Sequence, residues 1–257
     1  MTTDNNTVSG LPAEAVEAYE QGLALARASG DARKIEEAAA LFLKAAEAGH
    51  PMAQCNLGFL HTIGDGVPVD HAKAAGYFLA AAQQGLPQAM FNLARFYVAG
   101  SGVKKDLPTA LGLYRKAAQM GHPDALYNLG IFHYSGDCGA EQDHAVAAVF
   151  FENAANAGHI KSCYSLGVCY SLGHGVEQDE VQAVAWYEKA AAGGEVNAAF
   201  NLGLYYYYGQ GGLPEDRDRA QELFAAAAAH GHLKAEAALA SLAAEKEAAE
   251  AQYDVVL

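Results

Sequence analysis

The sequence predicts an all-α fold, an α-solenoid of tandem antiparallel helix pairs, and three observations carry this prediction. A shift of 36 or 37 residues brings whole phrases of the chain into register with one another. Within each repeat, small and apolar residues recur at helical spacing, as at Ala125, Leu129 and His133. Glycines separate two such segments in every repeat. The connections are short, so neighbouring helices must run antiparallel.

The boundaries of the repeats are placed at equivalent positions along the chain. Five units of 36 or 37 residues span 51–86, 87–122, 123–159, 160–195 and 196–232. A divergent unit at about 13–50 precedes them, and a half unit follows, which we expect to form a capping helix over 233–252. Atypical ends suit a stacked array, whose terminal faces meet water. We expect the solenoid to occupy 13–245, with a disordered tail at 1–12 and a short tail at 253–257.

Two residue types mark the helix ends. Glycine follows the first helix of every unit, where it supplies the left-handed backbone that closes a helix. An aspartate precedes the second helix of every unit, where its carboxylate accepts hydrogen bonds from free amide groups. These aspartates are Asp70, Asp106, Asp143, Asp179 and Asp216. We interpret them as helix caps and not as catalytic groups.

Positions that recur in every unit predict the core. Each first helix carries a leucine followed by glycine or alanine, a residue small enough to let the partner helix approach. We expect the bulky residue four positions after that leucine, and the aromatic residue of the second helix, to be core or half-core. The bulky residues are His61, Tyr97, His133, Tyr170 and Tyr206, and the aromatic residues are Phe78, Tyr114, Phe151, Tyr187 and Phe224.

Composition excludes several classes of protein. The chain has 257 residues, 52% of them hydrophobic and 18% charged, which favours a folded protein. It has no apolar run long enough for a transmembrane helix, and because the segment MTTDNNTVSG is polar we expect no export signal there. The net charge of −14 disfavours nucleic acid and anionic membranes as partners. Four cysteines are too few for a disulfide framework. We therefore expect a cytoplasmic monomer with reduced thiols.

Motifs for catalysis or metal binding are absent from the sequence. Four of the ten histidines follow the last glycine of a unit, but packed helices lie about 8–10 Å apart, too far for two imidazoles to share one zinc ion. An SxxK string begins at Ser101, in a loop between helices and without the companion motifs of penicillin-recognising enzymes. We expect no catalytic residue, no metal and no cofactor. Cys138, in a loop, is the one thiol to test for reactivity.

The phrases NLGIFHYSG, GHGVEQD and AVAWYEKAAAGG, with their copies, resemble the Sel-one-like repeat family across nearly all of residues 13–245. This family is related to the tetratricopeptide repeats. The resemblance implies a right-handed α/α superhelix whose concave face is lined by the first helix of each unit. It also implies a scaffold or adaptor that binds other proteins. Some secreted members have a disulfide that ties the two helices of each unit, and this sequence lacks that pairing.

On this resemblance, first-helix residues that lie off the packing face would line a binding groove. Four lines of such residues begin at Met52, Cys55, Phe59 and Thr62. Aromatic and arginine side chains dominate interface energetics, and amides can hold the backbone of an extended peptide. The candidate binding residues are Asn92, Arg95, Tyr127, Asn128, Tyr134, Lys161, Tyr164, Phe200, Asn201 and Tyr207.

Alternative roles remain open for these candidates. The aromatic rings could pack on the next unit, the amides could bond a neighbouring helix, and Arg95 and Lys161 could be solvated charges. If the ring of Tyr164 lies in the groove, Tyr164→Ala should change stability little, whereas Ala154→Leu should lower it.

Two functions fit the sequence. The first is a non-enzymatic scaffold or adaptor that binds a peptide or protein partner in the groove. The second is a cytoplasmic regulator or toxin-neutralising, immunity-like protein that covers its target with its acidic outer surface. Salt separates the two, because binding through an acidic surface weakens steeply with ionic strength and groove binding through aromatic contacts does not.

Overall fold

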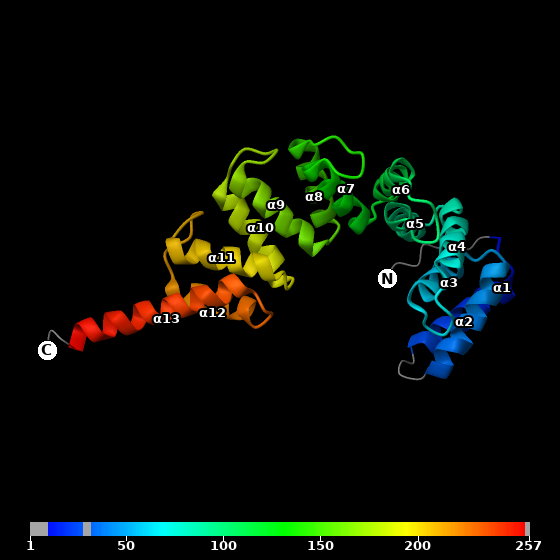
Figure 1. Ribbon diagram of the computed structural model, residues 1–257, viewed down its shortest axis with the longest axis horizontal. Helices are drawn as coiled ribbons and strands as arrows, with labels where there is room; N and C mark the ends of the chain where they lie inside the picture. Colours follow the sequence, from blue (N-terminus) through cyan, green and yellow to red (C-terminus); the bar gives the residue numbers. More distant parts are fainter. Residues whose placement is uncertain (1–9, 28–31, 255–257) are drawn as a thin grey trace. The chain divides into compact units, whose positions relative to one another are not determined.

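The computed structural model describes residues 10–27 and 32–254, and every regular element in these ranges is an α-helix (Figure 1). The helices are α1 (Ala13–Arg27), α2 (Ala32–Glu47), α3 (Pro51–Ile63), α4 (His71–Gln83), α5 (Pro87–Ala99), α6 (Leu107–Gln119), α7 (Pro123–Ser135), α8 (His144–Asn156), α9 (Ile160–Leu172), α10 (Glu180–Ala192), α11 (Val196–Tyr208), α12 (Arg217–Ala228) and α13 (Leu233–Asp254). The prediction of an all-α fold built from tandem antiparallel helix pairs is confirmed.

The chain divides into two compact units. Unit 1 comprises the residues up to Phe132 together with Gly136–Glu141, and unit 2 comprises His133–Ser135 and the residues from Gln142 onward. In unit 1, the pairs α1–α2, α3–α4 and α5–α6 pack internally, and α2–α3 and α4–α5 contacts join successive pairs. In unit 2, α9–α10 and α11–α12 are the packed pairs, and α8–α9, α10–α11 and α12–α13 contacts link them. Each unit is therefore a stack of helix pairs.

The helix ends follow the signals in the sequence. The Asp70 carboxylate accepts a hydrogen bond of 2.9 Å from the Lys73 backbone N–H, and this bond lowers the pKa of Asp70. Asp106, Asp143, Asp179 and Asp216 cap α6, α8, α10 and α12 in the same way. The five first helices α3, α5, α7, α9 and α11 all end at a left-handed glycine. The assignment of these aspartates as caps is confirmed.

One loop glycine in each unit also allows a close approach between helix pairs. Gly102 has φ +67°, and a Cβ atom there would collide with the backbone carbonyl of His71 at the start of α4. Gly175 has φ +76° and meets the backbone of His144, at the start of α8, in the same manner. Glycine is therefore required twice over, by the backbone conformation and by the space available.

The core consists of the recurring positions. Leu57 is 1% exposed, and its neighbour Gly58 lies so close to α4 that a Cβ atom would come within 2.7 Å of the Phe78 ring. Gly167 meets Tyr187, and Gly203 meets Phe224, in the same way. The second-helix aromatics are fully buried, and the bulky residues four positions after each leucine are buried or half-buried. The core prediction is confirmed.

The histidines that follow the last glycine of a repeat have a structural role. Ring nitrogen Nδ1 of His50 accepts a hydrogen bond from the Ala53 backbone N–H, capping α3, and His122, His159 and His232 do the same for α7, α9 and α13. The rings of His50 and His122 also stack on Tyr19 and Phe91, with centroids 4.2 Å and 4.9 Å apart. Burial lowers the pKa of both His50 and His122, which favours the neutral ring that a cap needs.

Parts of both expected tails lie outside the described residues. At the N-terminus, residues 1–9 of the tail expected at 1–12 are outside the described range, and helix α1 begins at Ala13. The C-terminal helix α13 continues to Asp254, and residues 255–257 of the expected tail lie outside the described range. Among the described residues, none of the helices has the length and apolar character needed to cross a membrane.

Candidate functional site

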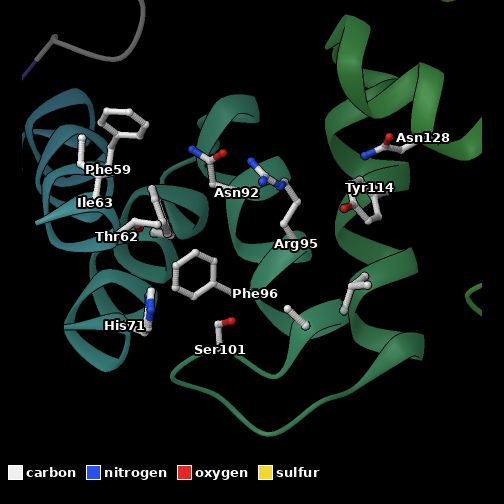
Figure 2. A pocket seen from close by; sticks show the side chains of 13 residues that line it. Phe59, Thr62, Ile63, His71, Asn92, Arg95, Phe96, Ser101, Tyr114 and Asn128 are labelled. Atoms are coloured by element: carbon white, nitrogen blue, oxygen red, sulfur yellow. The ribbon is translucent and has the colours of Figure 1, made fainter. Parts of the chain in front are cut away.

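A pocket of about 490 Å³ opens in unit 1 between α3, α4, α5, α6 and the middle of α7. This volume lies in the range of ligand-binding pockets. Figure 2 shows Phe59 and Ile63 of α3 on one wall and Tyr114 and Asn128 on the other. Between these walls, α5 contributes Asn92 and Arg95 (Figure 2). The pocket therefore has an apolar wall and a polar wall.

Helical spacing explains why these side chains meet. Phe59 and Ile63 are four residues apart on α3, and Asn92 and Arg95 are three apart on α5, so each pair lies on one face of its helix. Among the ten binding residues proposed from the sequence, the pocket brings together Asn92, Arg95 and Asn128. Three further first-helix positions of the expected lines, Phe59, Thr62 and Val98, also line it.

The two amides in the pocket differ in what they already bind. The Asn128 side chain hydrogen-bonds to the hydroxyl of Tyr114, on the preceding helix pair. Asn92 donates to the Cys55 sulfur at 4.0 Å and accepts from the Gln88 side chain at 3.5 Å. Both contacts of Asn92 are long for hydrogen bonds, so most of the bonding capacity of its amide is available to a ligand.

Arg95 and the apolar wall are open to solvent. The Arg95 guanidinium lies over the Phe91 ring, 5.9 Å from its centroid, and forms no ion pair with any carboxylate in the described ranges. Phe59 is 54% exposed and Ile63 is 51% exposed. Two large hydrophobic side chains and an arginine without a carboxylate partner are thus exposed at the same pocket.

In unit 2, two of the candidate tyrosines have internal partners. The Tyr134 hydroxyl lies 2.8 Å from Nδ1 of His174, and its ring stacks on His144 with centroids 4.7 Å apart. The Tyr207 hydroxyl donates to both carboxylate oxygens of Glu245 on α13, at 2.8 Å and 3.1 Å. These two side chains hold successive elements of unit 2 together.

Of the other five candidates, three contact neighbouring side chains of unit 2. Phe200 packs on Phe224 and stacks on His232, with centroids 5.6 Å and 4.5 Å apart, and the Asn201 side chain hydrogen-bonds to the Tyr187 hydroxyl. Tyr164 is half-buried, with its ring 6.0 Å from that of Tyr187. The remaining two, half-buried Tyr127 and exposed Lys161, lie on α7 and α9. None of these five lines the pocket of unit 1.

One expected line needs a correction at its first residue. Cys55 is 6% exposed and lies against the side chain of Asn92, so it belongs to the core and not to an open surface. Burial raises its pKa to about 11. The physical reason is the next helix pair, because α5 covers the face of α3 that carries this thiol.

Sequence reasoning missed several residues that line the pocket. His71 and Phe96 meet edge to face, with ring centroids 5.9 Å apart, and Ile63 and Ser101 lie at the ends of helices or in a loop. The positions of Ile63 and Ser101 vary from repeat to repeat. The available signal was the four-residue spacing of Phe59 and Ile63, which places both on one face of α3.

Reactive chemistry is not favoured at the cysteines. All four are free thiols, and three of them are buried. Half-buried Cys138 has its pKa raised, mainly by burial and then by the nearby Asp137 carboxylate. A raised pKa leaves less thiolate for nucleophilic attack. The described residues also contain no group of three metal-ligating side chains. The pocket is therefore equipped for binding through apolar contact, hydrogen bonds and charge.

Comparison with known proteins shows what the chain is similar to. The profile of the Sel1 repeat matches residues 15–50, 51–86, 87–122, 123–159, 160–195 and 196–232. A search of curated protein sequences found no match.

Three solved structures illustrate the likeness in fold. The protective antigen c5321 of uropathogenic Escherichia coli strains, which displays an SLR fold, is 32% identical with a TM-score of 0.80, over 88% of this chain and 48% of that one. The present chain thus spans about half the length of that protein. A Sel1 repeat protein from Oxalobacter formigenes is 32% identical with a TM-score of 0.78, over 84% and 86% of the two chains. The immunity protein PA5088 from Pseudomonas aeruginosa, 24% identical over 95% and 86% with a TM-score of 0.56, is similar in fold alone.

Proposed function

Because the chain belongs to the Sel1 repeat family, whose members generally mediate protein–protein interaction, we propose that it is a non-enzymatic scaffold or adaptor that binds a peptide or protein partner in the pocket of unit 1. Among the candidate residues, Asn92, Arg95 and Asn128 contact the partner in this proposal, together with Phe59 and Ile63. The proposal places the protein in the cytoplasm as a monomer, where its four free thiols stay reduced.

The observation that carries the proposal is that the pocket exposes apolar side chains together with polar groups that have no close partner. Phe59 and Ile63 are each more than half exposed, next to an arginine without a carboxylate partner and an amide with only long contacts. Leaving such groups unpaired contributes little to the stability of the free protein. A partner that covers the two apolar side chains and satisfies the polar ones gains affinity from each contact.

The proposal is tested by affinity capture from a lysate of the source cell, with the wild type and a matched pair of double variants as baits. Phe59→Ala with Arg95→Ala removes one exposed apolar side chain and one exposed cation from the pocket. Leu233→Ala with Lys234→Ala removes the same two kinds of group from the exposed start of α13 in unit 2. Both variants should unfold at the same temperature as the wild type, because all four side chains are exposed. A partner that binds the wild type and the α13 variant but not the pocket variant supports the proposal.

A partner retained by both variants would contradict binding in the pocket. The salt dependence of that binding then decides whether the second candidate function takes its place. The observation that favours the second candidate is the net charge of −14, because a strongly acidic surface can attract a basic target. If affinity for the retained partner falls steeply with ionic strength, the protein acts as an immunity-like regulator through its acidic outer surface.

A further inference from the structure

The repeat that contributes most of the pocket has the opposite charge to the rest of the chain. Residues 87–122 contain five cations and one carboxylate, in a chain of net charge −14. The cations are Arg95, Lys104, Lys105, Arg115 and Lys116, and the carboxylate is Asp106. Each of the other five matched repeats contains more acidic than basic residues. Unit 1 therefore carries a positive segment within an acidic protein.

These cations are available to a ligand. All five are exposed, and none forms an ion pair with a carboxylate of the described residues. In unit 2, by contrast, Arg217 pairs with Glu215 and Glu245 at 3.1 Å and 2.9 Å, and Arg219 pairs with Glu222. The positive charge of residues 87–122 is thus not neutralised within the fold, and its field acts on whatever approaches the pocket.

The pocket residues define the chemistry of the group that would neutralise this charge. The planar guanidinium of Arg95 suits a carboxylate, which it can bind through two parallel hydrogen bonds. Asn92, three residues earlier on the same face of α5, can donate to the same carboxylate or to the backbone beside it. Phe59 and Ile63, on the wall that faces Asn92 and Arg95, suit an apolar side chain nearby (Figure 2). A ligand that satisfies both walls carries an acidic and an apolar side chain close together.

Unit 2 contains such an arrangement within the chain itself. On α13, Leu242 and Glu245 are three residues apart and face α11. Leu242 is buried, while the Glu245 carboxylate accepts hydrogen bonds from the Tyr207 hydroxyl and the Arg217 guanidinium. Leu242 and Glu245 of α13 thus pack beside α11, with the carboxylate bound by a tyrosine of α11 and an arginine of α12.

From these observations we infer that the pocket of unit 1 selects an acidic peptide segment of its partner, in which a carboxylate binds Arg95 and a neighbouring apolar side chain packs on Phe59 and Ile63. This inference rests on the proposed function and names the class of partner that the same site takes. The acidic surface elsewhere on the chain repels such a segment. The positive charge of residues 87–122 therefore also directs the acidic segment to the pocket of unit 1.

The test uses a phage-displayed library of random peptides, selected on the full-length chain. We expect the recovered peptides to be enriched in Asp and Glu beside Leu, Ile or Phe, and to lose binding to the Phe59→Ala, Arg95→Ala variant. A recovered peptide is then synthesised with fluorescein, together with its Glu→Gln counterpart, and both are titrated by fluorescence anisotropy. The glutamine version should bind about tenfold more weakly to the wild type, because it loses the charge-assisted bonds to Arg95.

The variant Arg95→Gln shows whether that difference comes from the arginine. It should bind both peptides with the same affinity, whereas the matched variant Lys234→Gln, at an exposed lysine of α13, should keep the tenfold preference. Peptides that need Phe59 but show no acidic enrichment, or a preference that survives Arg95→Gln, would overturn this inference and leave the proposed function intact. A selection without any peptide that depends on Phe59 would overturn the proposed function, and the inference with it.

Discussion

The first helices of the two units share one packing pattern but differ in what they leave open. In unit 1, the pocket between α3 and α5 measures about 490 Å³ and exposes Phe59, Ile63 and Arg95. In unit 2, the cavity between α11 and α13 measures about 140 Å³, and its polar side chains Tyr207 and Glu245 bond to one another. The same packing pattern thus builds the core of both units but leaves different side chains open at these two places.

One variable position accounts for much of this difference. It is occupied by Thr62 and Val98 in unit 1 and by Tyr134, Ser171 and Tyr207 in unit 2. Each unit 2 side chain has a hydroxyl that reaches a partner farther along the chain: His174, Tyr205 and Glu245, respectively. The Thr62 hydroxyl donates to the Gly58 carbonyl of its own helix at 2.7 Å, and the Val98 side chain has no hydrogen-bonding group. The pocket of unit 1 therefore lies where the side chains at this position do not bond to the next repeat.

The largest effect should come from loop glycines, and it should be equal in the two units. Gly102→Ala and Gly175→Ala each place a Cβ atom on a left-handed residue and against the backbone of a neighbouring helix. We expect each to lower the free energy of unfolding by about 2–5 kcal/mol, from backbone strain and overpacking together. Urea unfolding followed by circular dichroism measures this loss. Gly112→Ala is the control, since a Cβ atom there meets no neighbour within 4 Å. A large loss in one unit alone would show that the two loops are not equivalent.

A smaller effect should follow from enlarging the small core residues. Ala117 in unit 1 and Ala154 in unit 2 occupy the same repeat position and are both 0% exposed. We expect Ala117→Leu and Ala154→Leu each to cost about 1–3 kcal/mol, because the added atoms overpack the space between helices. The measurement is the urea midpoint, with Ala145→Leu on the exposed surface of α8 as the control. If Ala117→Leu were tolerated and Ala154→Leu were not, the core around α6 would be looser than the fold implies.

The residue at the variable position of unit 1 can be replaced by the one that unit 2 carries there. Val98→Tyr gives unit 1 the residue that unit 2 carries at Tyr134 and Tyr207. We expect the ring to occupy part of the pocket and to weaken binding of a selected peptide by about tenfold, or about 1.4 kcal/mol. The melting temperature should stay near that of the wild type, since Val98 is only half-buried. Fluorescence anisotropy measures the affinity. Unchanged affinity would mean that the peptide does not pass Val98.

The smallest effect concerns a bond that both units share. Tyr114 and Tyr187 each hydrogen-bond to an asparagine of the next helix pair, Asn128 and Asn201. We expect Tyr114→Phe and Tyr187→Phe each to cost about 1 kcal/mol at neutral pH, the usual contribution of one hydrogen bond. Urea unfolding of each variant beside the wild type measures this cost.

Alkaline pH should then reduce the advantage of the wild type. Burial raises the pKa of Tyr114 to about 12 from 10.0. A raised pKa stabilises the fold fully below pH 10, and this contribution is lost as the pH rises toward 12. The difference in unfolding free energy between the wild type and Tyr114→Phe should therefore shrink over that interval. A difference that is constant with pH would mean that the hydroxyl is not buried.

Most of the fold could be predicted from the sequence because every repeat meets the same packing requirements. Asp70 and its copies cap the second helix of all five repeats from 51 to 232, since the free amide groups at a helix start need an acceptor wherever they occur. Leu57 with Gly58, and their copies, recur because the aromatic ring of the partner helix always needs the same space. Repetition within one chain thus separates packing residues from variable ones.

The site was predicted less completely. Asn92 and Asn128 look equivalent in the sequence, yet Asn128 bonds to Tyr114 and Asn92 has only long contacts. The difference arises because the residue corresponding to Tyr114 in the preceding pair is Phe78, which has no hydroxyl to offer Asn92. Cys55 was expected at an open surface, but α5 covers it. In each case the outcome depends on a residue one repeat away.

By itself, the sequence determined the period, the helix pairs, the caps and the core of this protein, because these follow from local spacing and from requirements that recur in every unit. Only the tertiary structure decided which first-helix residues are open to a partner. Tyr134 meets His174 at a separation of 40 residues, and Tyr207 meets Glu245 at 38. Exposure of a side chain in a stacked fold is set by neighbours at this distance along the chain, which spacing within a single repeat does not reveal.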